Sequence, residues 1–67
     1  MSKMELREAI ENACQDWIAL EDIALAVERD NDYLQNHIIP SMLEEGLIER
    51  MYPDVPRHPY QKYKKKS

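Results

Sequence analysis

The spacing of apolar residues near the start of the chain predicts a helix. Leu6, Ile10 and Cys14 recur every four residues, so they share one face of a helix. Ser2 precedes this run, and Glu5 stands three residues after Ser2, which is the spacing of an N-terminal capping box. We therefore expect the first helix over about residues 3–15, with its apolar face against a core.

A second helix is expected over about residues 20–29. Ile23 and Val27 share one face, and two acidic residues occupy the first turn, where they favour the positive end of the helix dipole. The apolar run 17–20 in front of this helix is typical of a short strand or an extended connection. Residues 29–32 break the apolar pattern with the letters Arg-Asp-Asn-Asp, because Asn and Asp favour turns and helix caps.

The apolar pattern resumes in a third helix, expected over about residues 32–45. Its apolar stripe extends from Leu34 to Met42. Gly46 follows at the position where helices commonly end in a left-handed residue. Pro40 conflicts with this helix, since an interior proline removes one hydrogen bond and costs about 3 kcal/mol. We retain the helix and expect a kink in the turn that ends at Pro40.

After the glycine the pattern changes from helical to extended. Residues 47–52 are typical of a strand, and residues 60–64 alternate enough to form the returning strand of a hairpin. Between them, residues 53–59 contain three prolines and are expected to form a loop.

The order of these elements predicts the fold class. A helix, a short strand, two helices joined by a tight turn, and a hairpin form the order of an α+β winged helix-turn-helix. We expect one domain over residues 1–67, with the wing over about 47–64 and a basic tail over 62–67.

The residues themselves resemble a known family. The matching pieces are Tyr33-Leu34, Ile39-Pro40, the run 43–49, Pro53-Asp54 with Pro56, and Gln61-Lys62-Tyr63. They are similar to the C-terminal winged-helix module of Fic/Doc-type proteins and of RecG-like helicase/regulator proteins, over about residues 17–65. The proline inside the third helix, the Pro-Asp-x-Pro loop and the Gln-Lys-Tyr strand are the more specific features. The AMP-transferring activity of Fic proteins belongs to a separate helical domain whose motif has no counterpart here, so the resemblance implies a winged-helix module without that activity.

Charge is divided unevenly along the 67 residues, whose net charge is −4. Residues 1–32 contain three bases and nine acids, whereas residues 33–67 contain six bases and four acids. From Arg57 onward there are five bases and no acid. A basic end of this kind is typical of an electrostatic handle for a polyanion, and equally of a solvated terminus.

The composition favours a cytoplasmic protein. Cys14 is the lone cysteine, so it closes no internal disulfide, which is typical of a reducing compartment. The longest apolar runs, 17–20 and 23–27, are far shorter than the roughly 20 residues that span a bilayer. No signal peptide is visible in the sequence. We therefore expect no membrane partner.

Residue types with catalytic or metal-binding chemistry are few and scattered. His37 and His58 do not combine with Cys or Asp at zinc-ligand spacing, and neither a nucleophile–base motif nor a glycine-rich phosphate loop is present. Glu44 and Glu45 are expected at a solvated helix end, and Cys14 is expected in the core. We therefore predict no enzyme activity, no catalytic or metal-binding residue and no cofactor.

The function that the pattern favours is DNA binding in transcription regulation. Polar side chains of the third helix would contact bases, since Asn and Gln pair with adenine, and basic side chains of the wing and tail would contact phosphates. The predicted groove contacts are Asn31, Tyr33, Gln35, Asn36 and His37. The predicted phosphate contacts are Arg57, Lys62, Lys64, Lys65 and Lys66.

The third helix, however, lacks basic residues. Between Asp30 and Glu45 there is no Lys or Arg, so a helix placed in a DNA groove would bring carboxylates toward phosphates. Tyrosine is enriched at protein interfaces, which favours a protein-docking or dimerisation module without DNA binding as the alternative. This alternative would use the helix face that contains Tyr33, Asn36, His37 and Pro40, together with the hairpin tyrosines Tyr52, Tyr60 and Tyr63. Duplex DNA, a second copy of the chain and a larger parent protein are therefore all open as partners.

Overall fold

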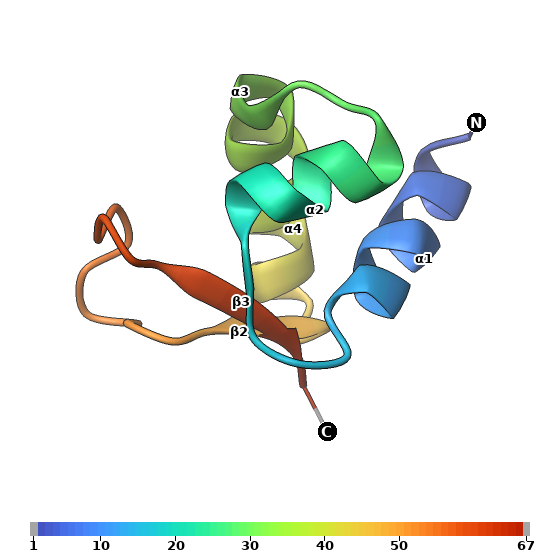
Figure 1. Cartoon of the computed structure of the whole chain (residues 1–67). Coiled ribbons are helices and arrows are strands. Elements are labelled where there is room, and N and C mark those ends of the chain that lie inside the picture. The colour runs from blue at the N-terminus through green and yellow to red at the C-terminus, as the bar shows by residue number, and fades with distance from the viewer. Residues whose placement is uncertain (1, 67) are drawn as a thin grey trace.

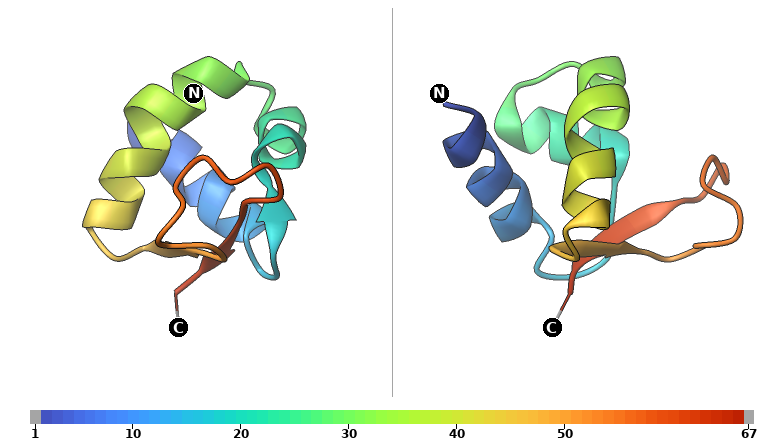
Figure 2. Two further views of the ribbon diagram at one scale, coloured as in Figure 1. Left: turned by 90° about the vertical axis from the view of Figure 1, so that its left-hand side faces the viewer. Right: turned by 180° about the vertical axis from the view of Figure 1, so that it is seen from behind.

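The computed structural model describes residues 2–66 and contains several helices and one antiparallel sheet (Figure 1). In chain order the elements are α1 (Lys3–Ala13), β1 (Ile18–Ala19), α2 (Leu20–Val27), α3 (Asn31–Tyr33), η1 (Leu34–Ile38), α4 (Ile39–Glu44), β2 (Ile48–Arg50) and β3 (Lys62–Lys65). The helices lie together on one side of the sheet, and the β2–β3 hairpin extends past them (Figures 1 and 2). The predicted α+β class is therefore confirmed.

The sheet has the strand order β1-β3-β2, so the last strand of the chain lies between the other two. Tyr63 of β3 pairs with Ile18 on one side and with Arg50 on the other. Directly opposed residues of antiparallel strands share one face, so these three side chains lie on the face toward the helices. The opposite face carries Glu49 and its partner Lys64.

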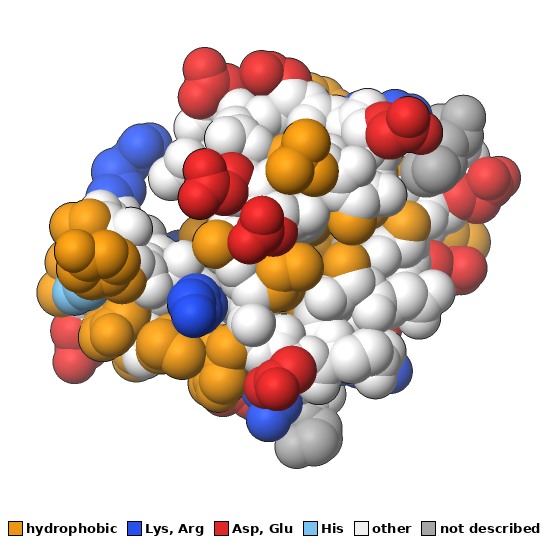
Figure 3. Space-filling model, viewed as in Figure 1, with side chains coloured by type: hydrophobic (Ala, Val, Ile, Leu, Met, Phe, Trp, Pro, Cys, Tyr) orange, Lys and Arg blue, Asp and Glu red, His pale blue; other side chains and the backbone are white. Residues whose placement is uncertain are grey.

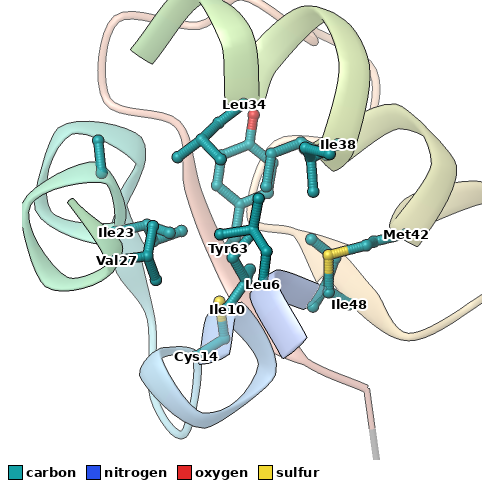
Figure 4. Close-up of a cluster of buried hydrophobic side chains, with 12 residues drawn as sticks. Leu6, Ile10, Cys14, Ile23, Val27, Leu34, Ile38, Met42, Ile48 and Tyr63 are labelled. Atoms are coloured by element: carbon teal, nitrogen blue, oxygen red, sulfur yellow. The ribbon is translucent and has the colours of Figure 1, made fainter. Parts of the chain in front are cut away.

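The core lies between the helices and this face of the sheet (Figure 4). Its buried side chains are Leu6, Ile10, Cys14, Ile23, Ala24, Val27, Leu34, Ile38, Ile39, Met42, Ile48 and Tyr63. The apolar stripes predicted for the three helices supply most of them. Figure 4 shows the ring of Tyr63 among these side chains, so the central strand anchors the hairpin to the helices.

Two helix ends follow the sequence prediction. The Ser2 hydroxyl accepts a hydrogen bond from the N–H of Glu5 at 3.1 Å, as its capping position requires. Gly46 has φ +75°, and the N–H groups of Gly46 and Leu47 donate to carbonyls of the preceding helix at 3.1 and 2.9 Å. This pair of bonds is the Schellman motif, which satisfies the last carbonyls of a helix.

Two helices end earlier than predicted. α1 ends at Ala13 rather than at residue 15, and α2 ends at Val27 rather than at residue 29. In α2 the cause is Glu28, which has a left-handed φ of 55°, so that the N–H of Arg29 donates back to the Ala24 carbonyl at 3.0 Å. α2 therefore ends in the same motif as α4, with a glutamate in place of glycine.

The predicted third helix is one helical segment from Asn31 to Glu44, but it contains a wide π turn. The N–H of Ile39 donates to the carbonyl of Leu34, five residues earlier. Pro40 follows directly, and in a regular α-helix its ring would collide with the carbonyl four residues before it. The wide turn relieves this collision, so the kink expected before Pro40 takes the form of a π turn.

The hairpin strands are shorter than predicted. β2 occupies three residues of the predicted strand 47–52, and β3 begins at Lys62 rather than at Tyr60. One further bond, from the Met51 N–H to the Lys62 carbonyl at 2.9 Å, closes the ladder. Beyond it, prolines cannot donate to a ladder, and the backbone forms turns. We call residues 51–61 the Pro-rich loop.

Candidate interaction surface of the third helix and the Pro-rich loop

The side chain of Gln61 holds the Pro-rich loop in shape. Its Oε1 accepts a hydrogen bond from the Tyr52 N–H at 2.8 Å, and its Nε2 donates to the Tyr52 carbonyl at 2.9 Å. The same nitrogen lies 3.1 Å from the Val55 carbonyl and 3.3 Å from the Pro56 carbonyl. Gln61 therefore satisfies backbone groups of the loop that have no strand partner.

Three aromatic rings are held together on this loop, and we call Tyr52, His58 and Tyr60 the ring cluster. The rings of Tyr52 and His58 stack with centroids 3.8 Å apart and an interplanar angle of 7°. The N–H of Tyr60 donates to Nδ1 of His58 at 3.0 Å, while the Tyr60 side chain is 74% exposed. Figure 3 shows apolar side chains and a histidine gathered at the projecting end of the hairpin. The loop thus presents an ordered aromatic surface to solvent.

A groove separates the Pro-rich loop from the helices. One hollow of about 370 Å³ lies between the start of α2 and the loop, and a second of about 270 Å³ lies between η1–α4 and the loop. Gln35, Pro56, Arg57 and Tyr63 line both hollows, so the two hollows adjoin, and we call them together the groove.

Two guanidinium groups line this groove beside Tyr63. Arg50 is the strand partner of Tyr63, and Arg57 comes from the loop. Burial raises the pKa of the Tyr63 hydroxyl, and the positive charges of Arg50 and Arg57 oppose that rise. The Nε of Arg50 is buried and has no hydrogen-bond partner among residues 2–66. The groove therefore has a concentration of positive charge at its α4 end.

Arg50 is a site residue that the sequence prediction missed. Its signal was the alternation in β2, where Ile48 is buried and the residue two positions later lies on the same face. A charged side chain on a core-facing position suggests a role, but only the strand register places it beside Tyr63.

The structure divides the predicted groove contacts of the third helix among three places. Gln35 and Asn36 line the groove next to the loop. Tyr33 and His37 do not line it, and their rings lie together with centroids 5.6 Å apart. Asn31 lines a separate hollow at the start of the helix.

That separate hollow is acidic. It has a volume of about 750 Å³ and surrounds Leu25, whose side chain is 76% exposed. The acidic residues that line it are Glu21, Asp22, Glu28 and Asp30, together with the single base Arg29. Figure 3 shows acidic side chains gathered over α2 and α3. The N-terminal end of the third helix is therefore bordered by negative charge.

The predicted phosphate contacts are also divided. Arg57 lines the groove, whereas Lys64 lies on the opposite face of the sheet, with its Nζ 5.8 Å from the ring centroid of Trp17. Lys65 and Lys66 lie with Lys64 and Gln15 around a small hollow near the last described residues. Lys62 is exposed on β3 and pairs with Ala19. The ten predicted residues thus belong to several surfaces.

Reactive groups are few in the described residues. Cys14 is buried, and burial together with the charge of Glu11 raises its pKa from 9.0 to about 11. A thiol with such a pKa is protonated at neutral pH and is a poor nucleophile. Within residues 2–66 no group of three or more His, Cys, Asp and Glu side chains could hold a metal ion. None of the helices in this range has both the length and the apolar character needed to cross a membrane.

Comparison with known proteins gives no functional assignment for the chain. No family model, no curated protein and no solved structure matches the chain. The relationship to Fic/Doc-type and RecG-like modules therefore stays the resemblance carried by the residues of the third helix and the hairpin.

Proposed function

We propose that the chain is a winged helix-turn-helix module that docks another protein through the groove and the ring cluster. The element order and the three-stranded antiparallel sheet are compatible with that fold. The observation that carries the functional proposal is an ordered aromatic loop beside a polar groove, in a chain whose third helix is bordered by acids.

Pre-ordering of the loop supports docking. Binding costs about 0.5–1.5 kcal/mol for each flexible side chain that it immobilises, and a surface already in place avoids much of this cost. Here the Tyr52 and His58 rings are stacked, and Gln61 fixes the backbone beneath them. Tyrosine and arginine are enriched in the residues that dominate interface energies, and Tyr60 and Arg57 are both exposed on the loop that borders the groove.

The charge distribution makes this surface unsuited to duplex DNA. DNA affinity depends mainly on bases that neutralise phosphates. A helix-turn-helix approach would bring Glu21, Asp22 and Asp32 near the backbone, whereas Lys64 points away from the helix face. Repulsion at the helix would therefore offset attraction at the loop.

DNA binding remains the second candidate because of one specific observation. Asn31, Asn36 and His37 are accessible along the third helix, and Arg57 is exposed on the loop that would be the wing. Asn side chains can read adenine in a major groove, and an arginine in a wing can contact phosphate.

A selection experiment with matched variants tests the docking proposal. The immobilised protein is used to select binders from a random peptide library displayed on phage, and enriched peptides are then synthesised and titrated by fluorescence anisotropy. Tyr60→Ser changes the ring cluster at a side chain that is 74% exposed, and Met4→Ser is the control at a side chain that is 71% exposed on α1. A labelled random-sequence duplex is titrated in parallel at about 50 and 200 mM salt, a range over which phosphate-driven binding weakens steeply.

We expect enriched peptides to bind the wild type and Met4→Ser equally, and to bind Tyr60→Ser at least 10-fold more weakly. We expect no saturable binding of the duplex at either salt concentration. Peptides that bind Tyr60→Ser as tightly as the wild type would refute docking through this surface. Salt-dependent duplex binding that weakens in Arg57→Gln would favour DNA binding, the second candidate.

A further inference from the structure

We infer that the α4 end of the groove is a carboxylate-binding subsite, formed by Arg50 and Arg57 with the side-chain amides of Gln35 and Asn36. This inference rests on the proposed docking function and adds the chemistry of the docked segment, which would present an acidic side chain to these groups. The four residues come from three separate elements, namely β2, the Pro-rich loop and η1, and they line one hollow of about 270 Å³.

The two arginines of this hollow form no ion pair within residues 2–66. The residues that line the hollow include both arginines and no acid. The ion pair between Arg7 and Glu45 involves neither of them, and no other ion pair occurs in the described part of the chain. Two guanidinium groups that line one hollow repel each other, and an anion between them would relieve that repulsion.

The guanidinium of Arg50 has one donor that no described residue uses. Its Nε is buried and has no acceptor among the described residues, which is costly for a charged group. A carboxylate in the hollow would meet the guanidinium groups of Arg50 and Arg57, and the side-chain amides of Gln35 and Asn36 offer further donors there.

The charge at the other end of the groove favours an acidic peptide over nucleic acid. At its α2 end the same groove is lined by Glu21. A nucleic acid strand carries a negative charge at every nucleotide, so one of its phosphates would lie near this carboxylate. A peptide can place one acidic side chain at the arginine end and a neutral or basic residue beside Glu21. The groove thus has one end with two arginines and no acid, and another end where Glu21 accompanies Arg57, which suits a peptide with separated charges.

Selection from the same phage-displayed peptide library, repeated on charge variants, tests the subsite. Arg57→Gln is exposed and should leave the fold intact, and Arg50→Gln removes the buried Nε. Arg29→Gln is the matched control, because Arg29 lines the acidic hollow instead of the groove. Folding of each variant is checked by circular dichroism and thermal melting, and Arg57→Gln keeps the test decisive if Arg50→Gln does not fold.

We expect the peptides enriched on the wild type and on Arg29→Gln to contain a preferred Asp or Glu position. We expect that preference to disappear on Arg57→Gln and on Arg50→Gln. For one such peptide, replacing the acidic residue by its amide should weaken binding to the wild type about 10-fold, and binding to Arg57→Gln less than 2-fold, since charged hydrogen bonds are the strong ones.

The outcomes separate this inference from the docking proposal. Peptides that depend on Tyr60 but show no acidic preference would overturn the subsite and leave docking intact. Absence of any peptide that depends on Tyr60 would overturn both. Salt-dependent duplex binding that is lost in Arg57→Gln would overturn the subsite in favour of a phosphate contact.

Discussion

Replacing Gln61 by methionine should loosen the Pro-rich loop without unfolding the rest of the chain. Methionine has a similar length but cannot donate, and it accepts only weakly. The Tyr52 N–H would lose its acceptor at 2.8 Å, and the carbonyls of Tyr52 and Val55 would lose a donor at 2.9 and 3.1 Å. Gln15→Met makes the same change at an exposed residue beside the opposite end of β3, and it serves as the control.

The size of the effect is set by these contacts. The Gln61 amide has only two N–H hydrogens for its three carbonyl neighbours, so the weakest contact, at 3.3 Å to Pro56, shares a hydrogen. Each remaining bond contributes roughly 0.5–1.5 kcal/mol net of water. Because Gln61 is half-buried and water can replace part of each bond, we take about 2 kcal/mol in total. That corresponds to about a 30-fold rise in the opening equilibrium of the loop.

Amide hydrogen exchange followed by NMR measures this opening directly. The Tyr52 amide should exchange about 30-fold faster in Gln61→Met, and less than 2-fold faster in Gln15→Met. The Leu47 amide donates to the Met42 carbonyl at 2.9 Å at the end of α4, and its exchange rate should be unchanged in both variants. The reasoning is refuted if the Tyr52 amide keeps its wild-type rate. It is also refuted if the Leu47 amide accelerates equally, because the loop would then open only with the whole chain.

Two further predictions concern the helical part of the chain. Glu28→Gly should raise the free energy of unfolding by about 0.5–1 kcal/mol, since glycine accepts the φ of 55° without steric cost; Glu28→Ala should give no such gain in the same urea titration. The pKa of Cys14 is raised to about 11 from an ordinary 9.0, so the folded state favours the neutral thiol. The stability that the neutral thiol contributes to the folded state is complete below pH 9, and it is lost as the pH rises through about 11. Between pH 8 and pH 11 the wild type should therefore lose more thermal stability than Cys14→Ala, and equal losses in the two proteins would contradict the assignment.

The sequence predicted best those features that a few neighbouring residues determine. Ser2 caps α1 and Gly46 ends α4 as expected, because each depends only on backbone groups within one turn of helix. The apolar faces of the helices were predicted for the same reason, since one period of about four residues places Leu34, Ile38 and Met42 together in the core.

Features that depend on distant partners could not be predicted in the same way. The shape of the Pro-rich loop depends on Gln61, which binds the backbone of Tyr52 nine residues away. The position of Lys64 depends on its register with Glu49, which places it on the face of the sheet away from the helices. A basic run in the sequence therefore gave no information about which basic side chains share a surface.

The four residues predicted to share one face of the third helix do not all reach the groove. In a regular α-helix each residue rotates by about 100°, and the sequence then places Tyr33, Asn36, His37 and Pro40 on one face. The extra residue in the turn between Leu34 and Ile39 rotates the first part of the helix by roughly that angle relative to α4.

Asn36 and Pro40 form a wall of the groove, whereas Tyr33 and His37 pair outside it. A ligand that fills the groove meets Asn36 and Arg50 in one hollow and His58 of the ring cluster in the other. A polyanion attracted by Lys65 and Lys66 would instead be drawn to the far end of the sheet, so of the basic residues from Arg57 onward only Arg57 lines the groove.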